Sequence, residues 1–360
     1  MRRRRSLRRW RFFTYGRIQD YYWLINIVLV MLIVAIIFPS LIVRGCQTPS
    51  ETKSDTIKIR KQPVKIPTED IEIRMYHHGS RKLMTLPLEE YVKGVLSAEM
   101  PASFEMEALK AQAVAARTLA VRNVRSLGGR GVSCYKGADV CDRHDHTQAW
   151  DSEEEQRKKW GGRYKEYAAK IAKAVEETRG EIITYKDEPI EVFYHSTSGG
   201  MTENVEDVFS KALPYLRSVS SEGEEDAPYF KDQLSMTAAQ FVKTFKKHYP
   251  KAKLSTSNLK TAIKILEYSE GGRVKTIRIG GVTVKGTDVR KIFGLRSANF
   301  SIVFKGNKVI FNTIGYGHGV GMSQIGANAM AEKGKTCVEI LAHYYQNTEV
   351  VTFQELMAKK

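Results

Sequence analysis

The feature that most constrains this chain is an apolar run near its N-terminus. Residues 22–43 are almost wholly apolar, with Asn26, Pro39 and Ser40 as the exceptions. At about 1.5 Å of rise per residue, roughly 20 apolar residues in a helix cover a hydrocarbon core of about 30 Å. We therefore predict one transmembrane helix over residues 22–43.

The charges beside the run predict its orientation. Eight arginines precede it within residues 1–21, whereas only Arg44 follows closely. The positive-inside rule makes residues 1–21 a basic cytoplasmic segment and leaves the rest of the chain outside the cell membrane. Two alternatives stay open. One is a cleaved signal peptide, whose apolar core is usually about 7–15 residues long, and the other is a lipoprotein box at residues 43–46, which Arg44 interrupts.

The net charge of +17 could be taken as a signature of nucleic-acid binding. The first 44 residues carry nine arginines and one aspartate, so they contribute almost half of the excess and have a topological role. We expect the basic exterior to face anionic wall polymers or lipid, or to be a solvated surface. A chain of 360 residues with 42% apolar residues supports a sizeable hydrophobic core. Its four cysteines could form too few disulfides to stabilise a fold of this size in place of that core.

The exterior divides into a stalk and one domain. Residues 44–67 are polar and contain three prolines, so we predict a stalk. Within residues 68–355 the apolar patterns predict a strand at 71–75, helices at 87–101, 104–124, 152–178 and 337–345, and β-rich stretches at 182–194 and 265–314. Residues 222–265 predict a helical insertion with an acidic start. Because helices and strands do not alternate as βαβ units, we predict an α+β fold.

Glu99 is the sharpest local candidate for chemistry. It is expected where Pro101 ends a helix, and it is flanked by Ala98 and Met100. The negative end of the helix dipole and the apolar neighbours both raise the pKa of a carboxyl group. A carboxyl group with a raised pKa serves as a general acid near neutral pH. Judged by spacing alone, a solvated surface glutamate is the commoner outcome, and that alternative stays open at this point.

Two glycine-bearing stretches carry further candidates. Residues 195–200 (HSTSGG) follow a strand and offer hydroxyl groups suited to sugars, but His195 and Ser196 would face opposite sides of that strand. Residues 315–324 (GYGHGVGMSQ) match neither a dinucleotide fingerprint nor a phosphate loop. They present His318 and Gln324 on a backbone that a ligand can approach closely. A polar or structural turn is the plain alternative for both stretches.

A loop with two cysteines and two histidines suggests a metal site. Cys134, Cys141, His144 and His146 could supply two thiolates and two imidazoles to a tetrahedral zinc ion, although the spacing matches no standard zinc finger. The alternative is a disulfide between the two cysteines, which an external compartment permits. We favour the metal, because two histidines so close to the second cysteine need a reason.

Three sequence blocks together resemble a known family. The first is residues 86–101 (LPLEEYVKGVLSAEMP) with 108–118 (ALKAQAVAART), the second is 195–203 (HSTSGGMTE), and the third is 315–327 (GYGHGVGMSQIGA) followed by His343-Tyr344-Tyr345. All three resemble the stage II sporulation protein D family, and the likeness extends over roughly residues 68–355. The stalk and residues 222–265 are less distinctive.

The resemblance implies a lytic transglycosylase, a peptidoglycan lyase that acts during engulfment in sporulation. Such an enzyme cleaves the bond between N-acetylmuramic acid and N-acetylglucosamine in peptide-stripped glycan strands and leaves 1,6-anhydro-N-acetylmuramic acid ends. The resemblance also implies two partners at the sporulation septum, a SpoIIP-like amidase and a SpoIIM-like membrane protein. It implies no binding of nucleic acid. Glu99 falls on the catalytic glutamate of the family. One carboxyl group suffices, because the sugar's own C6 hydroxyl is the nucleophile, whereas hydrolases normally use two carboxyl groups.

The same transfer assigns substrate-binding residues, which are His195, Ser196, Ser198, His318 and Gln324. Gln112 and Arg117 would join them if the helix over 104–124 packs under Glu99. Zinc binding is known in the family, so the resemblance also implies a structural Zn²⁺ that the chemistry does not require. A hypothesis of a different class stays open, in which the chain is a non-catalytic septal scaffold that binds glycan and recruits an amidase.

Overall fold

The computed structural model describes residues 71–209 and 211–359. The predicted cytoplasmic segment (1–21), transmembrane helix (22–43) and stalk (44–67) lie outside these residues. None of the helices in the described ranges combines the length and the apolar character that crossing a bilayer requires.

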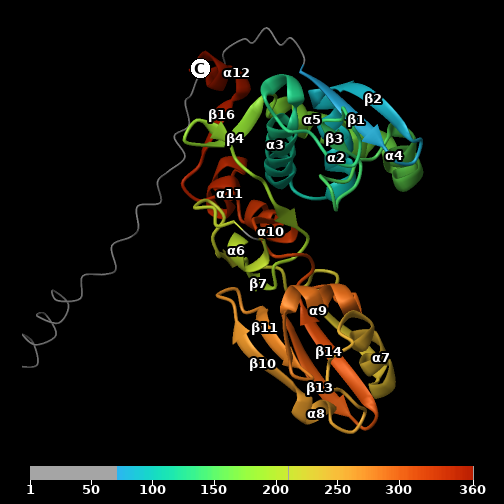
Figure 1. The fold of residues 1–360 in the computed structure, drawn as a ribbon. Coiled ribbons are helices and arrows are strands. Elements are labelled where there is room, and N and C mark those ends of the chain that lie inside the picture. Colours follow the sequence, from blue (N-terminus) through green and yellow to red (C-terminus); the bar gives the residue numbers. More distant parts are fainter. Residues whose placement is uncertain (1–70, 210, 360) are drawn as a thin grey trace, which may run out of the picture. The chain divides into compact units, whose positions relative to one another are not determined.

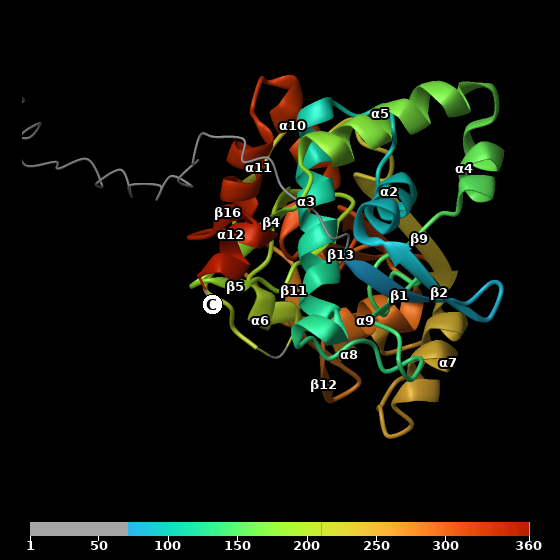
Figure 2. The same ribbon diagram turned by 90° about the horizontal axis from the view of Figure 1, so that it is seen from above.

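The larger of two hydrophobic cores is built around helix α3 (Met106–Asn123). Its alanines are fully buried, so neighbouring elements approach its backbone closely. It packs against a set of elements that come from distant parts of the chain, namely α2 (Leu88–Glu99), α5 (Tyr164–Glu177), β4 (Glu181–Tyr185), α10 (Gln324–Glu332) and α11 (Cys337–Tyr344). Seen from above, α3 lies between α2 on one side and α10 and α11 on the other (Figure 2).

Four small sheets surround this core. Strand β1 (Glu72–His77) pairs antiparallel with β2 (Lys82–Pro87) and parallel with β3 (Val140–Cys141). Strand β4 lies between β16 (Glu349–Thr352) and β5 (Glu188–Pro189). The other two sheets are β15 (Met322–Ser323) with β6 (Tyr194–His195), which is parallel, and β7 (Gly200–Met201) with β8 (Ser220–Ser221). This part also contains the α-helices α4 (Glu153–Trp160), α6 (Val205–Val208) and α12 (Phe353–Ala358) and the short 3-10 helices η1 (Arg125–Leu127) and η2 (Gly161–Arg163).

Residues 231–314 form a second lobe (Figure 1, gold to orange). It has its own core, in which Phe241 stacks on three other phenylalanines, Phe245, Phe293 and Phe311. One sheet has the strand order β10-β11-β12 and the other has the order β13-β14-β9. The elements of the lobe follow one another as β9 (Lys231–Thr237), α7 (Ala238–His248), α8 (Leu259–Ala262), β10 (Ile263–Tyr268), β11 (Val274–Ile279), β12 (Val282–Lys285), α9 (Gly286–Phe293), β13 (Phe300–Lys305) and β14 (Lys308–Ile314).

The α+β prediction is confirmed, and the helical insertion over 222–265 is wrong. Strand β9 occupies residues 231–237, where exposed and half-buried side chains alternate as expected of a sheet with one covered face. The lobe also extends to residue 314 and is mixed in structure. The charged helix predicted over 152–178 is divided into α4 and α5, because Gly161 adopts a positive φ of 52° between them.

Candidate active site

Glu99 is the last residue of α2, as the sequence predicts. The helix begins after Pro87, buries the stripe Leu88, Tyr91, Val92, Val95 and Leu96, and ends because Met100 is extended ahead of Pro101. The last turn therefore holds the Glu99 side chain at the edge of the core, where it is half-buried.

Two contacts hold the Glu99 carboxyl group. The backbone N–H of Ala149 donates to Oε1 at 2.7 Å, and Nε2 of Gln324 lies 3.5 Å from Oε2. Burial raises the pKa of Glu99, and these two donors offset part of that effect. The negative charge of Asp151 raises the pKa further, while His144 acts in the opposite direction. A carboxyl group with a raised pKa retains its proton closer to neutral pH.

The segment that carries Ala149 is fixed on α2 and α3 by its neighbours. The side-chain amide of Gln148 is buried and donates to the hydroxyl oxygen of Tyr91 at 3.1 Å, while its oxygen accepts from Tyr194 at 2.7 Å. Trp150 lies over Gly94 so closely that a Cβ there would be 2.1 Å from the indole nitrogen. No sequence motif marks this segment, since only the three-dimensional structure brings it to Glu99.

Glu99 lines an open cleft of about 350 Å³. The opposite wall comes from the junction of α4 and α5 and presents Lys159, Trp160 and Tyr167, while residues 98–103 form the rest of the lining. The sequence does contain a signal for this wall. Gly161 and Gly162 are adjacent, and together they interrupt the helix predicted over 152–178.

Gln324 and Ser196 come to the Glu99 side through the parallel pair β6 and β15. Gln324 is the first residue of α10, directly after β15, and the backbone N–H of Ile325 donates to the Ser196 carbonyl oxygen at 3.0 Å. Ser196 follows β6 two residues after Tyr194, so its side chain shares the face of Tyr194. Of the residues transferred from the resemblance, Gln324 therefore contacts the Glu99 carboxyl group.

His195 and Ser198 are buried, which corrects their expected position in an open groove, whereas His318 is half-buried, with its ring 5.5 Å from that of His195. His195 Nε2 lies 2.9 Å from Ser198 Oγ, and its Nδ1 lies 3.2 Å from the Val320 carbonyl oxygen. Burial lowers the pKa of His195 well below its usual value and lowers the pKa of His318 to about 3, so both rings are neutral at pH 7. His195 and His318 contact the backbone of the glycine-bearing motif at the Val320 carbonyl oxygen and the Val320 N–H, respectively.

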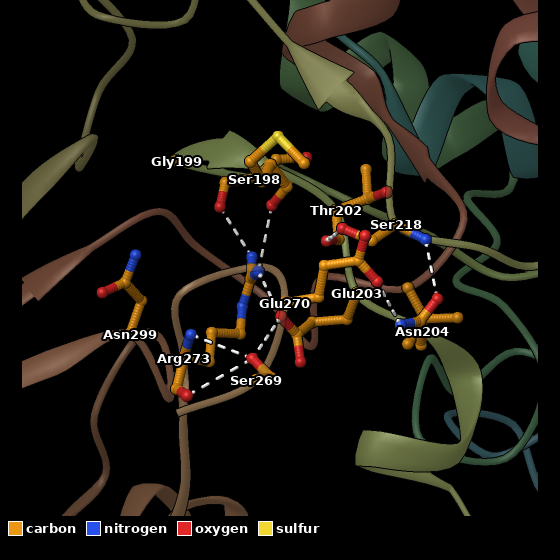
Figure 3. A network of polar contacts seen from close by, with 12 residues as sticks. Ser198, Gly199, Thr202, Glu203, Asn204, Ser218, Ser269, Glu270, Arg273 and Asn299 are labelled. Carbon is orange, nitrogen blue, oxygen red and sulfur yellow. Dashed lines mark hydrogen bonds and ion pairs between the residues drawn. The ribbon is translucent and has the colours of Figure 1, made fainter. Parts of the chain in front are cut away.

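The loop after β6 is held by two buried charged side chains. The Glu224 carboxylate accepts from the backbone N–H groups of Ser198 and Gly199 at 3.1 and 2.7 Å. From the second lobe, Arg273 donates to the Ser198 carbonyl oxygen at 2.6 Å and pairs with Glu203 at 3.2 Å (Figure 3). The 198–203 loop is thus a structural joint between the first core and the second lobe.

Arg117 and Gln112 are also not groove residues. Arg117 is fully buried, and its guanidinium group forms a bidentate pair with Glu89, with Nη2 to Oε2 at 2.6 Å and Nε to Oε1 at 2.9 Å. Gln112 is fully buried on α3, where its side chain lies against the Tyr194 phenol. The expectation failed because α3 presents these side chains to the core.

The structure brings together four residues able to hold a metal ion, three of which were predicted from the sequence. Cys134, Cys141 and His146 lie with His78, their ligand atoms within 4.8 Å of one another, and His144 is outside the group. His78 enters because β1 pairs with β3 so that Tyr76 lies opposite Cys141, and His78 extends two residues further along the same face. Both cysteines are free thiols in the structure.

The donor set fits a structural zinc ion. Two sulfur and two imidazole donors are the composition of closed tetrahedral sites. His78 Nδ1 lies 2.5 Å from Asp142 Oδ1, which leaves its Nε2 for a metal and gives the ring the carboxylate partner usual for zinc-bound histidine.

Comparisons with known proteins agree with the sequence blocks. The family described as stage II sporulation protein matches residues 76–185. The chain is 40% identical over 316 residues to stage II sporulation protein D of Bacillus subtilis (strain 168), covering 87% of each chain. It is 36% identical to stage II sporulation protein D of Bacillus amyloliquefaciens, covering 88% of this chain and 87% of that protein. It is also 29% identical to a Bacillus subtilis protein named amidase enhancer, over 73% of this chain and 40% of that protein.

Proposed function

Since the chain belongs to the stage II sporulation protein D family, we propose that it is a lytic transglycosylase of the sporulation septum. Its substrate would be glycan strands whose stem peptides an amidase has removed, and its product would carry 1,6-anhydro-N-acetylmuramic acid ends. The predicted membrane helix over 22–43 would hold the enzyme at the cell membrane with residues 45–360 outside. The observation that carries the proposal is the half-buried Glu99 carboxyl group, whose pKa is raised, on the wall of an open cleft.

The reaction requires one group that gives and then takes a proton. Protonated Glu99 would donate to the leaving glycosidic oxygen of N-acetylglucosamine as the bond to C1 of N-acetylmuramic acid breaks. The C6 hydroxyl oxygen of the same muramic acid residue would bond to C1, and its proton would pass to the Glu99 carboxylate. The raised pKa of Glu99 supports the first half of this cycle, and the donors from Ala149 and Gln324 suit its charged form in the second half.

Glu99→Gln tests this proposal. We expect the substitution to lower the release of anhydro-muropeptides from peptide-stripped glycan by at least about 10²-fold, the usual contribution of a general acid. Mass spectrometry of the digest identifies the product, which is one water lighter than the hydrolytic product. Glu90→Gln is the matched control, because Glu90 is an exposed residue of the same helix that pairs with Lys93. Undiminished anhydro product from the Glu99 variant would contradict the proposal.

The second candidate function is the non-catalytic scaffold. The relative named amidase enhancer favours it, since that name describes an effect on an amidase. Under this hypothesis the chain binds glycan and recruits a SpoIIP-like amidase, together with a SpoIIM-like membrane protein. The same digest distinguishes the two, because a scaffold releases no anhydro product from stripped glycan and increases the amidase rate when the amidase is added.

We also propose that Cys134, Cys141, His146 and His78 hold a structural Zn²⁺. The ion would tie strands β1 and β3 to the loop that leads to Ala149, and it would take no part in the bond-breaking step. Elemental analysis of the purified chain should find one zinc, which His78→Ala removes and His144→Ala retains. A disulfide between the cysteines, detected as a loss of two hydrogens in the intact mass, would overturn the assignment.

A further inference from the structure

The wall of the cleft opposite Glu99 contains two aromatic side chains that no part of the mechanism uses. Trp160 ends α4, and Tyr167 lies one turn into α5, with their rings 5.8 Å apart and edge to face. Both are half-buried and line the same cleft as Glu99. A sugar ring presents C–H groups on its faces, and a partly exposed aromatic side chain offers it an apolar, rigid surface.

Lys159 stands beside this aromatic surface and is anchored in place. Its ammonium group donates to the Ser97 carbonyl oxygen at 2.7 Å, at the open end of α2, and to Asp151 Oδ2 at 3.0 Å. An ammonium group has three donors, so one remains for a ligand. The Lys159 side chain is 45% exposed and that of Asp151 is 22% exposed, so the cation is the partner that faces the cleft.

The substrate changes its charge at one defined point. In a peptide-bearing strand, the lactyl group of muramic acid is bound to the stem peptide as a neutral amide. Hydrolysis of that amide by an amidase leaves a free carboxylate on each muramic acid residue. A fixed cation in the subsite would therefore distinguish a stripped strand from a peptide-bearing one, since a charge-assisted hydrogen bond is roughly twice as strong as a neutral one.

We propose that the cleft beside Glu99 is a subsite for a muramic acid residue, in which Trp160 stacks on the sugar ring and Lys159 binds the free lactyl carboxylate. This inference rests on the proposed substrate. The contact with Lys159 would explain why the amidase acts first and the glycan is cleaved second, because the amidase must create the carboxylate that Lys159 binds.

Binding measured in the Glu99→Gln background tests the subsite without turnover. The probes are the tetrasaccharide of two N-acetylglucosamine–N-acetylmuramic acid units with free lactyl carboxylates, and the same tetrasaccharide with each carboxylate converted to its methylamide. Isothermal titration of the full chain gives the affinity for each. We expect about tenfold tighter binding of the carboxylate form, a preference that Lys159→Met abolishes and Lys159→Arg retains. Trp160→Ala should weaken both probes by about tenfold.

Lys170→Met is the matched control. Lys170 also donates from α5 to a carbonyl oxygen, that of Phe104 at 2.5 Å, but it does not line the cleft. The inference is overturned if Lys159→Met weakens both probes equally, if the starting chain shows no preference, or if Lys170→Met changes the preference as much. It stands if the preference depends on Lys159, even when the unsubstituted chain yields no anhydro product, a result that would refute only the proposed reaction.

Discussion

Replacing Arg117 by methionine separates a structural role from a role in binding glycan. The Arg117 side chain has no exposed surface, and its partner Glu89 is 8% exposed. Besides the bidentate contact with Glu89, the guanidinium group donates to the carbonyl oxygens of Glu181 at 3.1 Å and Val175 at 3.3 Å. Methionine fills similar space but leaves the Glu89 carboxylate buried without its cation.

The expected cost is large. Removing one partner of a buried ion pair lowers the free energy of unfolding by about 3–5 kcal/mol, out of roughly 5–15 kcal/mol for a whole domain. For a domain of this size the midpoint of thermal unfolding should fall by about 10 °C. Circular dichroism on heating measures the midpoint. Titration with the carboxylate tetrasaccharide below the transition should find the affinity unchanged.

Two further variants make the test specific. Arg122→Met changes an exposed arginine of the same helix, whose loss should cost no more than about 1 kcal/mol. Combining Arg117→Met with Glu89→Leu removes both charges and should recover most of the lost stability, because an apolar pair can replace a buried ion pair. An Arg117 variant that melts like the unsubstituted chain but binds glycan weakly would refute the structural role.

Two other substitutions examine the surroundings of Glu99. Gly94→Ala places a Cβ within 2.1 Å of the Trp150 indole, so we expect the 149–151 segment to move and anhydro product release to fall at least tenfold. The control Gly162→Ala, which meets no atom within 4 Å, should retain activity, and equal rates for both would count against the segment's role. Asp151→Asn removes a charge that raises the pKa of Glu99, so the basic limb of the kcat/KM profile should move to lower pH. Loss of activity at every pH would instead indicate a hydrolase that uses Asp151 as its second carboxylate.

Local sequence was enough to predict Glu99 and the helix that carries it. Pro87, the apolar stripe and Pro101 lie within fifteen residues, and neighbouring positions along the chain determine how that helix begins and ends. The apolar neighbours Ala98 and Met100 predict the burial that raises the Glu99 pKa. Its two hydrogen-bond donors could not be predicted, since Ala149 and Gln324 are 50 and 225 positions away.

The metal ligands show the same limit. Spacing within the loop favoured His144, yet the fourth member of the cluster is His78, which lies 63 positions before Cys141. Only the parallel pairing of β1 with β3 brings it there, and a two-residue strand such as β3 leaves no periodic pattern to detect. In the second lobe, apolar and polar residues alternate only weakly along β9, and neither face of the strand is strongly apolar. The sequence therefore did not indicate a strand there, and the helical prediction was wrong.

The way the second lobe leaves the first core makes it a removable module. Its first strand, β9, and its last, β14, are paired at their ends, so that Lys231 lies opposite Ile314 and the N–H of Gly315 donates to the Phe230 carbonyl oxygen at 2.8 Å. A cut at both positions leaves two chain ends already close enough for a short turn to join. The 84 residues between them could be excised or exchanged for another lobe, provided that the replacement supplies a cation for Glu203 in place of Arg273.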